Sequence, residues 1–316
     1  MDGLARGATI VLPTFRRVES LERLLTTLAA QRDPGFPWDV LLVDNDDPPG
    51  AREVFDRHAA TLPGGSRFLH EEIRGSAYAR NAGIGGVTRE VTVFCDDDVV
   101  PRSDWLSCLV EPILSGRCEG TGGRVVLDPS VPRPGWFDEA SLGGYLAAWD
   151  LAERERDLEP GEIVVSSNCA YRTDILKRTG GFDPALGPRG KTPLVNDDAL
   201  VTRRFQELGG RVRFVPRALV IHELPPERLN RRYLLKRAYM HGRSDWILDR
   251  DLMSAGRAKG AGSALRALGR ELALRKKEGI ANPRVAFHAA CDIARSAGSL
   301  REALVLALSR GPTSRD

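Results

Sequence analysis

The feature that most constrains this chain is a short apolar run, residues 91–95, which leads directly into three consecutive carboxylates, Asp96–Asp98. Apolar residues with β-branched neighbours predict a buried strand. Three adjacent like charges repel one another and resist removal from water, so they must lie at the open end of that strand. Two interpretations stay open at this point. The triplet is either a solvated acidic turn or a site for a divalent cation, because hard cations gather carboxylate and phosphate oxygens.

The first hundred residues alternate between predicted strands and predicted helices. Strands are expected at 8–12, 38–43, 67–70 and 91–95, and helices at 18–28, 51–60 and 76–85. This alternation predicts an α/β fold with a mostly parallel, doubly wound sheet. In such sheets ligands bind outside the carboxyl ends of the strands. We therefore expect Thr14, Asp44 and the Asp96–Asp98 triplet to share one edge.

Two common phosphate-binding motifs are missing from this region. The segment from Gly75 to Gly83 lacks the G-K-[ST] ending of a P-loop, and no G-x-G-x-x-G follows the first strand. Arg80 lies on the predicted helix of this segment. It has two possible partners, a nucleotide with its phosphates or the acidic edge of the sheet, and the sequence favours neither.

The middle of the chain adds further strands and two loops. Strands are expected at 120–127, 163–171, 212–215 and 218–221, and loops at 128–136 and 183–196, the second long enough to act as a lid. Asp197 and Asp198 open a predicted helix, where acidic residues are commonly caps. His222 follows the last strand, as either a structural residue or a metal ligand.

Charge is divided unevenly along the chain. From Arg228 onward there are 19 Lys and Arg against 8 Asp and Glu, whereas the first 227 residues carry 27 against 35. This basic, helical C-terminal region would suit phosphates, an anionic acceptor or a membrane surface, or it consists of solvated helix faces. The apolar patch at 304–308 would pack on the body, pair with a second subunit or touch a membrane. The formal net charge of +3 implies no nucleic-acid partner.

The five cysteines are scattered and form no C-x-x-C pair, which indicates a reducing compartment. The N-terminal apolar run ending at Pro13 is too short for a signal peptide, and no uninterrupted apolar run is long enough to span a bilayer. We expect a cytoplasmic protein. Peripheral membrane contact, or a homodimer through the C-terminal helices, remains open.

Taken together, the segments resemble a family 2 inverting glycosyltransferase of the GT-A fold. The matching pieces occur in family order from Ala8 to about Ser244. They are the residues 10–14, 42–45, 79–83, 94–99, 167–172, 180–183, 196–198 and 220–222. The resemblance implies a GT-A domain at 1–227, Rossmann-like with flanking helices, and a helical extension at 228–316.

The resemblance also implies roles for individual residues. The nucleotide-sugar-binding set would be Pro13, Thr14, Asp44, Arg80, Asp96 and Asp97, with Thr14 and Asp44 at the base. Asp98 would be the D-x-D ligand to Mg²⁺ or Mn²⁺, and His222 a further metal or diphosphate contact. Asp198 matches the general base, whereas Asp197 stands where the family usually has Glu, which leaves open which acid is the base.

These residue types suit metal-assisted single displacement. A metal ion would neutralise the charge that develops on a diphosphate leaving group, and a carboxylate would take the proton of the acceptor hydroxyl. The implied donor is a UDP-, dTDP- or GDP-sugar, and the acceptor a glycan, a lipid-linked molecule or a small natural product. The alternatives are a sugar nucleotidyltransferase and a non-catalytic module that binds nucleotide sugars or glycans.

Overall fold

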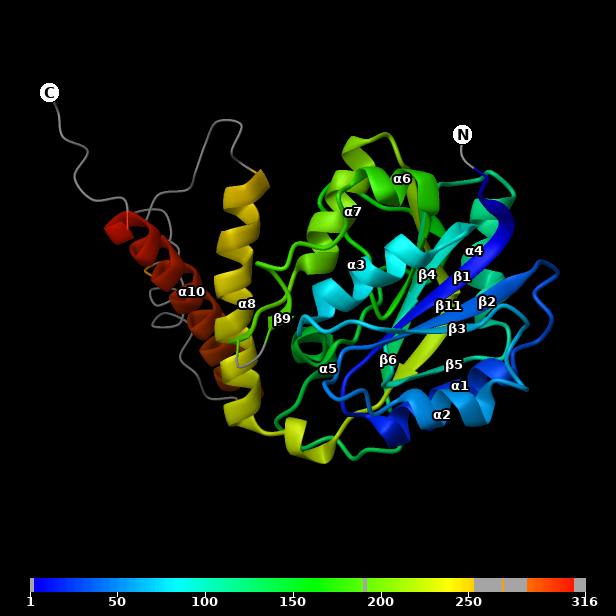
Figure 1. Cartoon of the computed structure of the whole chain (residues 1–316). Helices are drawn as coiled ribbons and strands as arrows, with labels where there is room; N and C mark the ends of the chain where they lie inside the picture. Colours follow the sequence, from blue (N-terminus) through cyan, green and yellow to red (C-terminus); the bar gives the residue numbers. More distant parts are fainter. Residues whose placement is uncertain (1–2, 190–191, 253–268, 270–282, 310–316) are drawn as a thin grey trace, which may run out of the picture. The chain divides into compact units, whose positions relative to one another are not determined.

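The computed structural model describes residues 3–189, 192–252, 269 and 283–309 of the chain (Figure 1). The chain forms two compact units, which are described separately. The sheet unit comprises Met1–Pro129, Ala147–Gly190 and Asp197–Glu223, and the helical unit comprises Ser130–Leu146, Lys191–Asn196 and Leu224–Asp316. The division into domains at 227/228 stays a prediction.

The sheet unit is built on a nine-stranded sheet in the order β3-β2-β1-β4-β8-β6-β11-β5, with β7 paired to β11. Strands β1, β2, β3, β4, β6 and β11 run in one direction, and β5, β7 and β8 run in the other. This confirms the mostly parallel sheet. The strands are β1 (Ala5–Thr14), β2 (Trp38–Asp44), β3 (Arg67–His70), β4 (Arg89–Cys95), β5 (Val99–Pro101), β6 (Gly120–Leu127), β7 (Arg156–Asp157), β8 (Asn168–Arg172) and β11 (Val212–His222).

Helices cover both faces of this sheet because its central strands are apolar on both sides. On β1, Ile10 and Leu12 belong to a core that includes side chains of α1, α2 and α4. Val11 between them belongs to a second core, with side chains of α3, α6 and α7. The helices are α1 (Val18–Ala29), α2 (Arg52–His58), α3 (Ser76–Gly86), α4 (Trp105–Leu114), α6 (Thr173–Arg178) and α7 (Asp197–Glu207).

The sheet topology brings three polar strand ends together. Strand β1 lies between β2 and β4 and is parallel to both, so their carboxyl ends share one edge. Thr14 at the end of β1 lies in register with Asp44 at the end of β2. Asp96–Asp98 form the turn that connects β4 to β5. The predicted meeting of these three strand ends is therefore present.

Two predicted strands differ from the structure. Only residues from Asn168 onward form β8, whereas 163–167 are irregular and Val164 packs against Gly122, where no side chain could fit. The two strands expected at 212–215 and 218–221 are one strand, β11, with an irregular register between Val215 and Leu219. Pro216 lies in this interval and lacks the N–H that a regular ladder needs.

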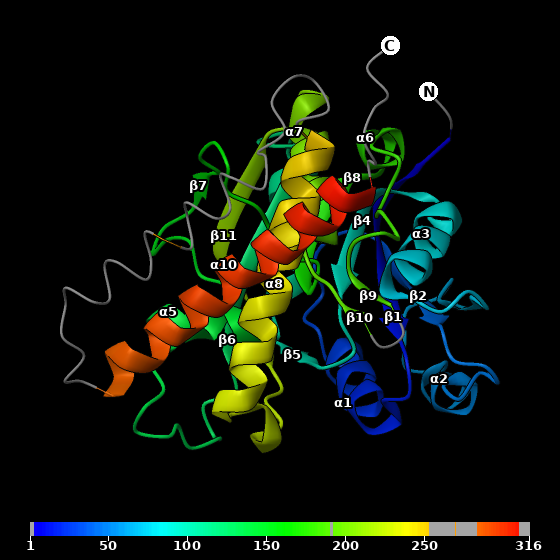
Figure 2. The ribbon, with the colours of Figure 1, turned by 90° about the vertical axis from the view of Figure 1, so that its left-hand side faces the viewer.

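The helical unit confirms helices in the C-terminal region. Its principal helices are α8 (Arg231–Leu252) and α10 (Pro283–Ser309), which cross in close contact (Figure 2). A Cβ added at Gly242 would lie 1.7 Å from the Arg295 carbonyl oxygen, so glycine is required where these two backbones meet. Shorter elements are α5 (Glu139–Leu142), η1 (Gly143–Leu146), β10 (Thr192–Pro193) and η2 (Pro226–Arg228), and β9 (Pro188–Arg189) belongs to the sheet unit.

Part of the predicted apolar patch can be examined on α10. Leu304 and Val305 are each 46% exposed, so they do not pack into the described part of the helical unit. The side chains of 306–308 lie outside the described residues. Among the helices that the structure describes, none is both long enough and apolar enough to cross a membrane.

Candidate active site

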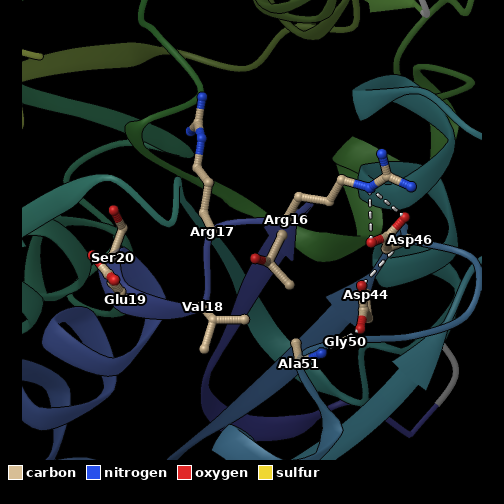
Figure 3. A pocket seen from close by; sticks show the side chains of 10 residues that line it. Arg16, Arg17, Val18, Glu19, Ser20, Asp44, Asp46, Gly50 and Ala51 are labelled. Atoms are coloured by element: carbon tan, nitrogen blue, oxygen red, sulfur yellow. Dashed lines mark hydrogen bonds and ion pairs between the residues drawn. The ribbon is translucent and has the colours of Figure 1, made fainter.

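A cavity of about 650 Å³ opens at the carboxyl ends of β1 and β2, as Figure 3 shows. The loop after β1, the start of α1 and the loop after β2 supply its walls. Its lining residues are Thr14, Arg16, Arg17, Val18, Glu19, Ser20, Asp44, Asp46, Gly50 and Ala51. The cavity therefore lies at the edge where the sequence predicts a ligand site.

Asp44 stabilises the floor of this cavity through its own loop. It is 1% exposed, and its carboxylate accepts hydrogen bonds from the N–H groups of Asp46 (3.0 Å) and Ala51 (2.7 Å). These bonds fix the loop that leads from β2 to α2. Pro13 lies beside the site in β1, opposite Val43 of β2. Contact of Pro13, Thr14 or Asp44 with a nucleotide stays a prediction.

Two consecutive arginines point in different directions at the mouth of the cavity (Figure 3). Arg16 has a left-handed backbone with φ of +56°, which is uncommon outside glycine. Its Nε donates to both carboxylate oxygens of Asp46, at 2.9 and 3.0 Å. Arg17, the residue before α1, donates from one guanidinium nitrogen to Asp97 Oδ1 (2.8 Å) and Asp98 Oδ2 (2.7 Å).

The acidic triplet is not a solvated turn. Asp97 is 4% exposed and Asp98 is 8% exposed. The Thr14 hydroxyl donates to Asp97 Oδ2 at 2.7 Å, so β1 is tied to the end of β4. Burial raises the pKa of Asp97 to about 6, although the neighbouring Arg17 lowers it. Two buried carboxylates thus depend on one arginine for their charge balance.

His222 at the end of β11 stands beside the third acid. Its Nε2 lies 3.6 Å from Asp98 Oδ1, and the residue is 5% exposed. Among the described residues, its buried Nδ1 has no hydrogen-bond partner. The Glu223 N–H donates to the Asp98 carbonyl oxygen at 2.8 Å, so the strand end and the acidic turn are held together.

This pair of residues fits part of a metal site. Over the described residues, no group of three or more His, Cys, Asp or Glu side chains is arranged to hold a metal ion alone. Mg²⁺ sites commonly use one or two carboxylates together with substrate phosphates and water. Asp98 and His222 would therefore hold the ion from the protein side, and a diphosphate would complete the site.

Arg80 on α3 links the triplet to a second acidic group. It donates to Asp96 Oδ1 at 2.8 Å and to Asp197 Oδ2 at 3.0 Å, and its side chain is only 7% exposed. The guanidinium also lies 5.3 Å from the centre of the Phe182 ring. Of the two interpretations of Arg80, the structure contains the ion pair with the acidic edge.

Asp197 and Asp198 at the start of α7 have different environments. Asp197 is 5% exposed and is paired with Arg80. Asp198 retains some exposure and accepts hydrogen bonds from the N–H groups of Ser166 (3.3 Å) and Ala199 (2.8 Å). Burial, and then the charge of Asp197, raise the pKa of Asp198 to about 7. A carboxylate that titrates near neutrality is matched to proton transfer.

Several residues of the site were not singled out from the sequence. The sequence offered a signal for Arg17, because two consecutive arginines directly follow a strand whose carboxyl end lies beside the acids. Gly187 and Ser166 had none, because their roles depend on tertiary contacts. Gly187 has φ of +80°, and a Cβ there would lie 2.7 Å from Asp197 Oδ2. The expected loop at 183–196 therefore approaches the second acidic group through a glycine.

The cavity at this sheet edge, the adjacent Asp98 and His222, and the separate acid on α7 are compatible with a group-transfer enzyme. The family model described as "Glycosyl transferase family 2" matches residues 9–180. Because this is more than half of the sequence, the chain belongs to glycosyl transferase family 2 and is a glycosyltransferase.

Curated relatives are similar over most of this chain. It is 28% identical to a glucosyl-dolichyl phosphate glucuronosyltransferase of Haloferax volcanii, over 76% of this chain and 77% of that protein. It is also 28% identical to a pre-mycofactocin glycosyltransferase of Mycobacterium tuberculosis, over 69% of this chain and 43% of that protein.

Solved structures share the fold. The mannosyltransferase PcManGT of Pyrobaculum calidifontis, solved in complex with GDP-Man and Mn²⁺, has a TM-score of 0.57 and 20% identity. The similarity covers 97% of this chain and 80% of that one. The predicted GT-A fold is therefore confirmed.

Proposed function

We propose that this glycosyltransferase moves a sugar from a nucleotide diphosphate to an acceptor hydroxyl by metal-assisted single displacement, with inversion and with Asp198 as the base. The observation that carries the proposal is the separation of two acidic groups with different properties. Asp98 is paired with His222 at the donor edge of the sheet. Asp198 lies on α7 and has a raised pKa, and its neighbour Asp197 is linked through Arg80 to Asp96 at the donor edge.

The two acids of α7 differ in their fitness as a base. Burial raises the pKa of Asp197 as well, but Arg80 opposes this and occupies one of its carboxylate oxygens, so Asp197 is less free to take a proton from a substrate. Within the described residues, the Asp198 carboxylate accepts hydrogen bonds only from backbone N–H groups, and the residue remains partly exposed. We therefore assign the base to Asp198, and we assign to Asp197 the role of raising the pKa of Asp198 by its charge, which Arg80 opposes.

The donor side has matching chemistry. A divalent ion, when bound, would neutralise charge on the leaving diphosphate. Asp98 and His222 would hold that ion, which is Mg²⁺ or Mn²⁺. The cavity beside Thr14 and Asp44 would hold the nucleoside, with Pro13 in its wall, and Asp96 and Asp97 would contact the donor or keep its contacts in place. The donor is a UDP-, dTDP- or GDP-sugar.

The alternatives explain less of the site. A sugar nucleotidyltransferase would attack a phosphate and has no need of an acid on α7 that titrates near pH 7. A non-catalytic nucleotide-sugar or glycan module has no need of a base. The raised pKa of Asp198, which costs stability wherever the group is ionised, therefore favours transfer to a hydroxyl.

The helical unit offers a surface for an anionic acceptor or an anionic membrane. No acid occurs between 228 and 244 in the sequence. Positive charge near the N-terminal end of α8 opposes the helix dipole, so it favours an external anion. Within the described residues, no ion pair is formed by five basic residues that lie close together in the sequence at this end of α8: Arg228, Arg231, Arg232, Lys236 and Arg237.

This surface is compatible with more than one acceptor. Arg231 lies 5.5 Å from the ring centre of Trp136 and 5.4 Å from that of Phe287, so aromatic and basic groups adjoin. The name of the Haloferax relative, a glucosyl-dolichyl phosphate glucuronosyltransferase, supports a lipid-linked acceptor. A glycan or a small natural product remains the alternative, and so does a homodimer through α8 and α10.

Calorimetric titration tests the donor half of this proposal. UDP, dTDP and GDP are titrated into the protein with Mn²⁺ and again after exhaustive chelation. We expect one nucleotide to bind at least about tenfold more tightly with Mn²⁺, because the ion joins its diphosphate to Asp98. The Asp98→Asn variant should lose this gain. Equal binding with and without metal would contradict the proposed role of Asp98.

A further inference from the structure

The position of Arg17 has a consequence for how the donor edge is loaded. One guanidinium nitrogen lies 2.8 Å from Asp97 Oδ1 and 2.7 Å from Asp98 Oδ2. It thus occupies the space between the two carboxylates where a small cation would otherwise sit. The Asp97 and Asp98 side chains are 5% and 11% exposed, whereas the Arg17 side chain is 41% exposed. A cation that approaches from solvent therefore meets Arg17 before it reaches the acids.

The chain holds Arg17 in this place through the residue before it. The left-handed backbone of Arg16 turns the two arginine side chains apart, and residues other than glycine seldom adopt this conformation. The Arg16 side chain donates to Asp46 in the loop after β2, and these bonds hold Arg16 in its left-handed conformation. The next residue is then free to point across the end of β1 toward β4. Burial alone would lower the pKa of Arg17, but Asp98 and Asp97 together raise it, so the guanidinium stays charged.

We propose that Arg17 is the resident counter-cation of the Asp97–Asp98 pair and that it is displaced when the metal and the donor bind together. In the free protein it neutralises two buried carboxylates and competes with a divalent ion for Asp98. When a diphosphate is present, Arg17 exchanges the carboxylates for phosphate oxygens, which suit a guanidinium equally well. The free energy of breaking the ion pairs is then offset only if the nucleotide binds as well.

This arrangement would make metal affinity depend on the nucleotide. A protein whose metal site carries its own cation binds Mn²⁺ weakly in isolation. It binds the ion tightly once a diphosphate provides an alternative partner for the arginine and additional oxygen ligands. Coupling of this kind is reciprocal, so Mn²⁺ should raise nucleotide affinity by the same factor. The inference rests on the proposed metal-assisted transfer.

The test measures Mn²⁺ binding directly, by loss of the electron paramagnetic resonance signal of free Mn²⁺, with and without the nucleotide that calorimetry selects. In nucleotide-free protein, Arg17→Gln should bind Mn²⁺ at least about tenfold more tightly than wild type, because a competing positive charge is gone. In the presence of Mn²⁺ the same variant should bind the nucleotide more weakly. Arg17→Lys should lie between the two.

Arg74→Gln is the matched control. It removes an arginine charge that lies 4.0 Å from Asp46 and leaves the Arg17 contacts with Asp97 and Asp98 in place, so its Mn²⁺ affinity should stay within about twofold of wild type. Asp98→Asn should bind no Mn²⁺ in either state. Thermal unfolding of each variant shows whether it is folded.

The outcomes separate this inference from the proposed function. Tight binding of Mn²⁺ to nucleotide-free wild type, or unchanged Mn²⁺ affinity in Arg17→Gln, would overturn the inference and leave metal-assisted transfer intact. If Arg17→Gln loses affinity for both Mn²⁺ and the nucleotide, the role of Arg17 is structural, and the inference is also overturned. If the wild type binds the nucleotide with the same affinity with and without Mn²⁺, the proposed function is refuted. The same result would also remove the coupling inferred here, because that coupling is reciprocal, whereas unchanged Mn²⁺ affinity in Arg17→Gln overturns the inference alone.

Discussion

The pH dependence of transfer tests the assignment of the base. Asp198 has a pKa of about 7 because it is buried and adjoins the charge of Asp197. At that pKa about a tenth of the molecules carry an ionised Asp198 at pH 6 and about nine tenths at pH 8. A base must be ionised to accept a proton, so kcat/KM should rise about tenfold between these pH values and level off above.

The Asp197→Asn variant identifies which residue gives this acidic limb. It removes the neighbouring negative charge, while an amide oxygen can still accept a hydrogen bond from Arg80. The pKa of Asp198 should fall, and the acidic limb should move to lower pH by about one unit. Stopped assays of nucleotide diphosphate release from pH 5 to pH 9 measure both profiles. The assignment of Asp198 as the base would be refuted if the acidic limb of the pH profile did not shift in Asp197→Asn. It would also be refuted if wild-type activity did not fall down to pH 5.

Three further predictions concern the surroundings of the site. Gly187→Ala should lower kcat/KM at least about tenfold, since its Cβ would displace Asp197, whereas Gly209→Ala, with φ of +89° and open space, should cost only about 1 kcal/mol of stability in urea denaturation. Asp198→Asn should raise the stability at pH 8 by up to about 4 kcal/mol, and this gain should fall as the pH drops through about 7 and vanish below about pH 3, where the wild-type carboxyl is neutral both folded and unfolded. Unchanged thermal midpoints at both pH values would contradict the raised pKa. Asn168→Ala removes three buried hydrogen bonds, to an indole N–H and two carbonyl oxygens, and should cost about 3 kcal/mol in urea denaturation. A loss below about 1 kcal/mol would show that water replaces them.

The sheet edge could be predicted because it depends on local patterns. Apolar runs that end in polar residues define strands and their open ends, and alternation with helices requires a parallel order. Thr14, Asp44 and the acidic triplet were placed together on this basis, and the structure confirms it. The resemblance to family 2, carried by short motifs in a fixed order, is confirmed by the family match.

Contacts between distant segments could not be predicted. The sequence allowed two alternative partners for Arg80, a nucleotide or the acidic edge of the sheet. Only the folded chain shows that it lies between Asp96 and Asp197. Arg17 received no role although a basic pair follows the first strand, because only the folded chain shows that it contacts Asp97 and Asp98. The irregular stretch before Asn168 was mistaken for strand, since buried apolar residues in a turn have the same composition as a strand.

In the proposed mechanism, donor binding and proton removal belong to separate groups. The Asp198→Asn variant distinguishes them when nucleotide binding with Mn²⁺ is measured by calorimetric titration and products from a panel of donor sugars are measured by mass spectrometry. We predict that this variant binds the nucleotide within about twofold of wild type and loses at least about a thousandfold in transfer. Transfer within about tenfold of wild type, or loss of nucleotide binding together with transfer, would contradict the account.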